Sequence, residues 1–80
     1  MAQFTASAIQ LTSGDSVAEN IAQAAPLIAQ AAAAGAQFIA IPENAFYMRR
    51  EGTAKIADVP LAAHAGVQFA QAAAKQHEVW

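Results

Sequence analysis

The first 42 residues alternate between apolar patterns of two kinds, and this alternation limits the folds open to the chain. Residues 3–12 are largely apolar or small on both faces, as in a β-strand that is covered on both sides. Residues 16–34 repeat apolar side chains at steps of three and four, which predicts an amphipathic helix. Residues 37–42 form a second apolar strand that ends at Pro42. This order predicts a βαβ unit with parallel strands and a right-handed crossover.

Local signals mark both ends of the first helix. Ser16-Val17-Ala18-Glu19 has the S-x-x-E form of a capping box, which places the helix start at Ser16. Gly35 suits the left-handed position that follows a helix. Pro26 lies inside the helix and removes one backbone donor, so we expect a kink or a local widening there.

The second half of the chain predicts a loop, a second helix and the start of a third strand. Residues 44–58 hold most of its polar and charged side chains and are interpreted as the loop. Asp58-Val59-Pro60 is expected to open the helix, with Pro60 at its first position and Lys75 and His77 near its C-terminus. The expected buried stripe is Leu61, Ala65, Phe69 and Ala72 or Ala73. Glu78-Val79-Trp80 then begins a strand, because strands and helices alternate.

Such a unit cannot form a stable core of ordinary size. Parallel sheets occur almost only when both faces are covered, and two helices cannot cover both. Of the 80 residues, 24 are alanine, so few large apolar side chains remain to offset an ordering cost of roughly 1.5 kcal/mol per residue. The sequence therefore predicts that residues 1–80 are the opening part of a larger α/β domain, cut at the start of the third strand.

Composition excludes several kinds of site and partner. The chain has no Cys, and hence no disulfide, zinc–thiolate site or thiol nucleophile of its own. Its net charge of −2 gives no footprint for nucleic acid or anionic membrane. His64 and His77 lack acidic or sulfur partners at ligand spacing, so we expect no metal site. With no basic, apolar leader and no uninterrupted apolar span, the sequence predicts a soluble, cytoplasmic protein.

Glu43 is the residue best placed for chemistry. Parallel strands carry their sites at their C-terminal ends, and Pro42-Glu43-Asn44 ends the second strand. Partial desolvation after an apolar run would suit a general base. An exposed loop carboxylate is the alternative, and position by itself leaves both open.

Three segments carry a resemblance to a known family. They are Ala8-Ile9-Gln10-Leu11-Thr12, the alanine-rich helix that ends at Ala33-Ala34-Gly35-Ala36, and Phe38-Ile39-Ala40-Ile41-Pro42-Glu43-Asn44. In this order they resemble the N-terminus of a nitrilase-superfamily carbon–nitrogen hydrolase. Residues 42–48 are most similar to the amidase branch that includes deaminated glutathione amidase and omega-amidase.

The resemblance implies a fold and an activity. The fold would be an αββα sandwich, of which this chain supplies the βαβα N-terminal portion. The activity would be cleavage of non-peptide carbon–nitrogen bonds of small amides by a Glu-Lys-Cys mechanism, with Glu43 as general base. The family needs no metal or cofactor and is usually dimeric. Tyr47 and Arg49 would line the substrate entrance, although a solvated loop is the alternative.

The chain also departs from the family. It lacks the nucleophilic Cys, and Lys55 and Lys75 stand in a loop and on a helix rather than on a later strand. We therefore expect these 80 residues alone to be inactive. Two other functions stay open: a non-catalytic α/β module that binds nucleotides or proteins, and an alanine-rich helical hairpin that pairs with a partner. Thr12-Ser13-Gly14-Asp15 would be a poor phosphate-binding turn for the former.

Overall fold

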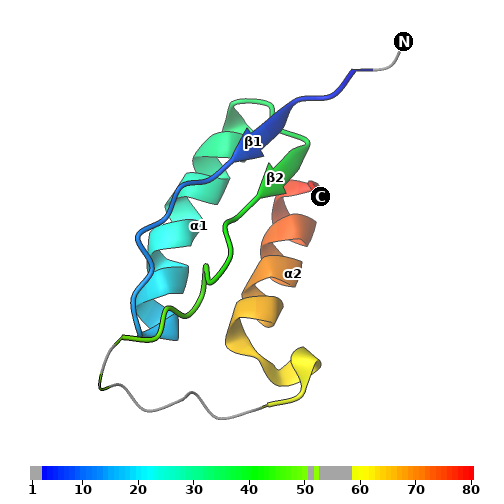
Figure 1. The fold of residues 1–80 in the computed structure, drawn as a ribbon. Helices are drawn as coiled ribbons and strands as arrows, with labels where there is room; N and C mark the ends of the chain where they lie inside the picture. Colours follow the sequence, from blue (N-terminus) through cyan, green and yellow to red (C-terminus); the bar gives the residue numbers. More distant parts are fainter. Residues whose placement is uncertain (1–2, 51, 53–58) are drawn as a thin grey trace.

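The structure is a computed structural model, and it describes residues 3–50, 52 and 59–80. The elements follow in the order β1 (Ala6–Ala8), α1 (Val17–Ala33), β2 (Phe38–Ala40), the 3₁₀-helix η1 (Leu61–Ala63) and α2 (Ala65–His77). Figure 1 shows both strands on one side of the two helices. The chain is thus a small mixed α/β fold with a parallel sheet of two strands, and the βαβα order is confirmed.

The sheet is parallel and short. Ala6 pairs with Phe38, and Ala8 pairs with Ala40. Both strands are shorter than the sequence predicted, and the segment after β1 forms hydrogen bonds with α1. Thr12, for example, pairs through its backbone N–H and C=O with the side-chain amide of Gln23, at 2.7 and 3.1 Å, rather than with β2. At Thr12 the side chain of Gln23 on α1 therefore replaces β2 as the hydrogen-bonding partner.

Both predicted ends of α1 are confirmed. The N–H of Glu19 donates to Ser16 Oγ at 3.2 Å, as an N-cap requires. At the other end Gly35 has a φ of +98°, and the N–H of Ala36 donates to the Ala31 carbonyl at 3.0 Å. These two features define a Schellman ending. The helix stays α-helical through Pro26, which is exposed, so the expected local widening does not occur.

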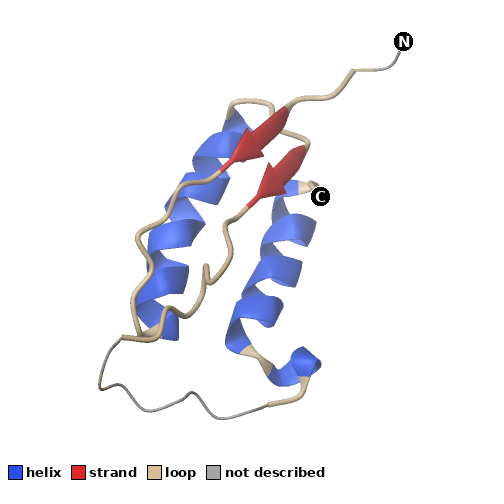
Figure 2. Cartoon of the chain, in the orientation of Figure 1, coloured by secondary structure: helices blue, strands red, loops and turns tan. Residues whose placement is uncertain are grey.

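Both helices cover the same face of the sheet (Figure 2). Ala24 and Ile28 of α1 and Ala73 of α2 form the buried cluster between them. The partly buried residues packed against this cluster come from the strand segments and from α2: Ile9, Leu11, Ile39, Ile41 and Phe69. The small side chains at Ala24 and Ala73 let the two helices lie close to each other and to the sheet.

None of the described elements covers the opposite face. This open sheet face consists of Phe4, Ala6, Ala8, Phe38 and Ala40, all of which are exposed. Phe4 keeps 70% and Phe38 keeps 47% of its surface accessible. The expectation that two helices leave one face bare is therefore confirmed for the described part of the chain.

The start of α2 differs from the prediction. The predicted opening includes Asp58, which lies outside the described residues. Pro60 precedes η1 rather than α2, and His64 then adopts an extended conformation with a ψ of 126°. The α-helix begins only at Ala65, where the N–H of Gly66 donates to His64 Nδ1 at 3.0 Å.

The buried stripe of α2 shifts as a result. Leu61, expected to be buried, is 76% exposed, and Ala65 is also exposed. Gly66 and Ala73 are the buried residues of the helix, and Phe69 packs against the core. The predicted periodicity was therefore correct from Phe69 onward and wrong in the first turn.

Trp80 lies against the outer edge of β2. Its N–H donates to the Gln37 carbonyl at 3.0 Å, and its carbonyl accepts from the N–H of Ile39 at 2.9 Å. This is the pattern of a parallel neighbour. It agrees with the expectation that a third strand starts at this point, on the side of β2 away from β1.

Candidate active site at the strand ends

Two loops leave the sheet at the same edge. Because β1 and β2 are parallel, the segment after β1 and the segment after β2 run in the same direction along α1 (Figure 1). The first carries Ser13 and Gly14, and the second carries Glu43, Tyr47 and Arg49. The parallel topology thus brings together two loops that are far apart in the sequence.

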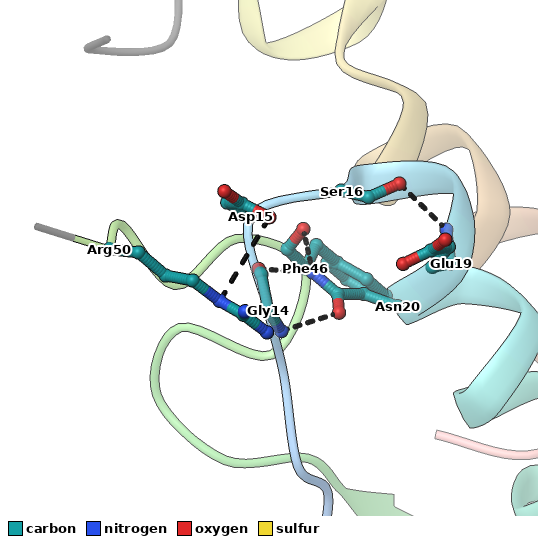
Figure 3. Close-up of polar contacts among 7 residues, drawn as sticks. All are labelled: Gly14, Asp15, Ser16, Glu19, Asn20, Phe46 and Arg50. Atoms are coloured by element: carbon teal, nitrogen blue, oxygen red, sulfur yellow. Dashed lines mark hydrogen bonds and ion pairs between the residues drawn. The ribbon is translucent and has the colours of Figure 1, made fainter. Parts of the chain in front are cut away.

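Asn20 joins these two loops from the first turn of α1. Its side chain is 3% exposed, and its amide is fully used (Figure 3). Oδ1 accepts from the N–H of Gly14 at 2.9 Å, while Nδ2 donates to the Gly14 carbonyl at 2.9 Å and to the Phe46 carbonyl at 2.7 Å. One buried side chain therefore bonds both loops to the helix.

Two further hydrogen bonds connect the loops directly. Ser13 Oγ donates to the carbonyl of Ala45 at 2.6 Å. The N–H of Met48 donates to the carbonyl of Gly14 at 2.8 Å. With Asn20, these contacts hold residues 13–14 and 45–48 together, and we call this set of hydrogen bonds the loop clamp. Its second segment, residues 45–48, follows Glu43 and Asn44 in the chain.

Glu43 itself is exposed. The described residues therefore do not provide the partial desolvation expected for a general base, and Glu43 has here the accessibility of a loop carboxylate. Its neighbour Asn44 has a φ of +57°, a conformation that asparagine tolerates better than most residues. Ala45 is then buried, at 5% exposure. The chain thus turns at Asn44, and the next residue, Ala45, is buried in the protein interior.

The other predicted residues follow Glu43 in the same segment. Tyr47 is half-buried and Arg49 is exposed, and each interacts with other residues of the protein. The neighbouring Arg50 lies across Gly14 and places Nε 4.0 Å from Asp15 Oδ1 (Figure 3). This ion pair is largely exposed, so it contributes little to stability. It does bring a cation to the loop after β1.

The remaining histidines and lysines lie at α2 or outside the described residues. His64 caps α2, and His77 lies in its last turn. Lys75 is exposed on α2, and Lys55 lies outside the described residues.

Among the described residues there is no group of three His, Asp or Glu side chains that could hold a metal ion. In the same part of the chain, no helix has the length and apolar character to cross a bilayer.

Sequence reasoning missed the loop clamp. No role was predicted for Asn20, yet the sequence contains a signal for one. The residue stands between Val17 and Ala24 at helical spacing, on the stripe that faces the protein interior. A polar side chain on such a stripe must find partners, because burying an unbonded amide is costly.

Comparisons of the chain with protein-family models, with curated proteins and with solved structures found no match. The functional conclusion therefore depends on the residues and their geometry.

Proposed function

We propose that the chain is the N-terminal portion of a cytoplasmic, homodimeric carbon–nitrogen hydrolase that cleaves small amides, with Glu43 as the general base. The observation that carries the proposal is the place of Glu43: it lies in the loop that follows β2, on the side of the parallel sheet where α/β proteins carry their sites. The Pro42-Glu43-Asn44 motif that resembles the nitrilase superfamily stands on this side.

The chemistry assigned to Glu43 is proton transfer. In a Glu-Lys-Cys mechanism the carboxylate accepts the proton of the thiol, and the sulfur then attacks the amide carbonyl. The amine leaves with a proton, and water hydrolyses the resulting thioester. This chain holds the Glu and lacks the Cys. The Lys and Cys would come from further sequence, which would also cover the exposed Glu43.

The open sheet face supports the proposal. An αββα sandwich packs one sheet against another, and the inner face of each sheet is apolar. Phe4 and Phe38 are exposed large apolar residues on a face that carries no charge. The backbone bonds of Trp80 along β2 add the first contacts of a wider parallel sheet. Both features fit a segment that belongs to a four-layer domain.

The geometry favours this proposal over a nucleotide-binding module. A phosphate-binding turn needs free backbone N–H groups after a strand. Here the N–H of Thr12 already donates to Gln23, and the N–H of Gly14 already donates to Asn20. The loop after β1 is thus bonded to α1, and these two N–H groups are already used by side chains of the protein.

The coding sequence beyond Trp80 provides the first test. An in-frame continuation with a Lys on a strand and a Cys at a strand-to-helix turn supports the proposal. A stop codon with no such sequence nearby contradicts it. The longer product would then be assayed for ammonia release from small amides with and without a carboxylate group.

Substitution of Glu43 provides the second test. In the longer protein, Glu43→Gln should lower kcat about 10²- to 10⁴-fold, because the amide cannot accept the thiol proton. Glu78→Gln, at an exposed carboxylate after α2, is the matched control and should leave kcat unchanged. Full activity of Glu43→Gln would exclude Glu43 as the base. The 80-residue chain itself should show no turnover.

A further inference from the structure

We propose that Asn20 is a positioning residue for Glu43, acting through the loop clamp. The effect of Asn20 on catalysis rests on the proposed function, whereas its effect on the conformation of the two loops depends only on the contacts in the structure. Asn20 lies one turn into α1, and its N–H donates to the Ser16 carbonyl at 3.0 Å. The residue is therefore fixed to a capped helix that packs on the core.

The chemistry of the site requires a carboxamide. Nδ2 donates to the carbonyl groups of Gly14 and Phe46, and Oδ1 accepts from the N–H of Gly14. Only an amide side chain of this length supplies two donors and one acceptor from one position. A carboxylate would keep the acceptor, lose both donors and place a negative charge against two carbonyl oxygens. An apolar residue would remove these three hydrogen bonds from partly buried backbone groups.

The clamp determines where Glu43 can lie. On one side, the chain is fixed by the ladder at Ala40, whose carbonyl accepts from Ile9 at 2.9 Å. On the other side, Ala45 and Phe46 are bonded to Ser13 and Asn20. Only a short connection with one left-handed residue, Asn44, joins these two fixed points. Loss of the clamp would free this connection on its C-terminal side, and Glu43 with it.

Amide hydrogen exchange in this chain, followed by NMR, tests the clamp. The N–H of Met48, which donates to Gly14, reports on the clamp, and the N–H of Ile9, which donates to Ala40, reports on the sheet. Asn20→Asp should speed exchange at Met48 roughly tenfold or more relative to Ile9. The control Ile28→Val weakens the buried cluster, to which no residue of the clamp belongs, and it should speed both amides by the same factor.

A second signal tests the position of Glu43. The coupling constant between the amide and α protons of Asn44 depends on φ, so it reports whether the left-handed turn persists. It should become averaged in Asn20→Asp and stay at its original value in Ile28→Val. If Asn20→Asp does not fold, Ser13→Ala removes the tie to Ala45 and should shift both signals in the same direction. Unchanged exchange ratio and coupling constant in the folded variant would overturn the proposal.

Activity separates this inference from the proposed function. In the longer, active protein, Asn20→Asp should lower kcat with little change in KM, and Ile28→Val should change neither. If the longer protein has no amidase activity, the proposed function fails while the exchange result on the clamp still stands. If it is active and Asn20→Asp retains full kcat, the positioning role fails while the function stands.

Discussion

The ring of Phe46 lies against the α-carbon of Gly66. A β-carbon at Gly66 would come 2.5 Å from Cδ2 and 2.7 Å from Cγ of Phe46, far inside van der Waals contact. The same ring meets Phe69 edge-on, with 5.9 Å between ring centroids and 81° between the ring planes. The loop after β2 is therefore packed onto the first turn of α2 at a position that only glycine allows.

Gly66→Ala should destabilise the protein. In an isolated helix this substitution would gain about 0.5–1 kcal/mol from backbone entropy. Here the new methyl group would overlap Phe46, and overpacking of this kind costs about 1–3 kcal/mol. We expect a net loss in the free energy of unfolding, measured by urea denaturation.

The Phe46→Ala background provides the control. Without the ring, Gly66→Ala should be neutral or stabilising, because only the helix propensity remains. A double-mutant cycle would then give a coupling free energy of opposite sign to the single-variant loss. If Gly66→Ala destabilises equally in both backgrounds, the contact with Phe46 is not the cause.

Gly35→Ala should destabilise through the backbone alone. Gly35 has a φ of +98°, and among the described residues only its chain neighbours come within 4 Å of a β-carbon built there. An L-residue at positive φ costs about 1–2 kcal/mol. Because the chain is short enough for chemical synthesis, D-alanine at this position makes a sharp comparison. It should be at least as stable as glycine in thermal unfolding, and equal losses for both enantiomers would contradict the argument.

Ser16→Ala should remove the N-cap of α1. The N–H of Glu19 would lose its acceptor, and caps of this type contribute about 1 kcal/mol. Ser16→Asp should retain most of the stability, since a carboxylate accepts the same hydrogen bond and interacts favourably with the helix N-terminus. Helicity and urea midpoints measured by circular dichroism would check this order. Equal stability of the Ala and Asp variants would show that the cap is unimportant.

The open sheet face should make the isolated chain self-associate. Contiguous exposed apolar surface of this kind marks an interaction or aggregation site. Ala8→Lys places a charge on this face, and sedimentation velocity should show a smaller associated fraction than for the original chain. Ala33→Lys adds the same charge at an exposed position of α1 and should have little effect. A monomer with a cooperative transition at high temperature would contradict the prediction.

The sequence predicted best what depends on neighbours in the chain. Ser16 and Gly35 gave both ends of α1 correctly, because a helix cap is a contact within a few residues. Pro60 did not give the start of α2, since proline fits both a 3₁₀ turn and a helix. The extended conformation of His64 decided the boundary, and Gly66 next to it is held by Phe46, which is distant in the sequence.

The candidate site also combines features that the sequence predicted with features that it did not. The parallel order of strands was enough to place Glu43 at the C-terminal edge of the sheet, as a consequence of topology. The helical pattern indicates that Asn20 needs partners, but it could not identify them, because the carbonyl of Phe46 is 26 residues away. The exposure of Glu43 was also decided by the fold, since it depends on which elements lie around the strand ends.

The sequence by itself thus determined the order of the elements, the caps of α1 and the edge at which Glu43 emerges. The tertiary structure decided that both helices lie on one face, that Asn20 joins the two loops and that Phe46 closes onto Gly66. The physical reason is the range of the interactions. Caps and periodicity act within one or two turns, whereas burial, loop contacts and steric fit arise only when distant segments meet.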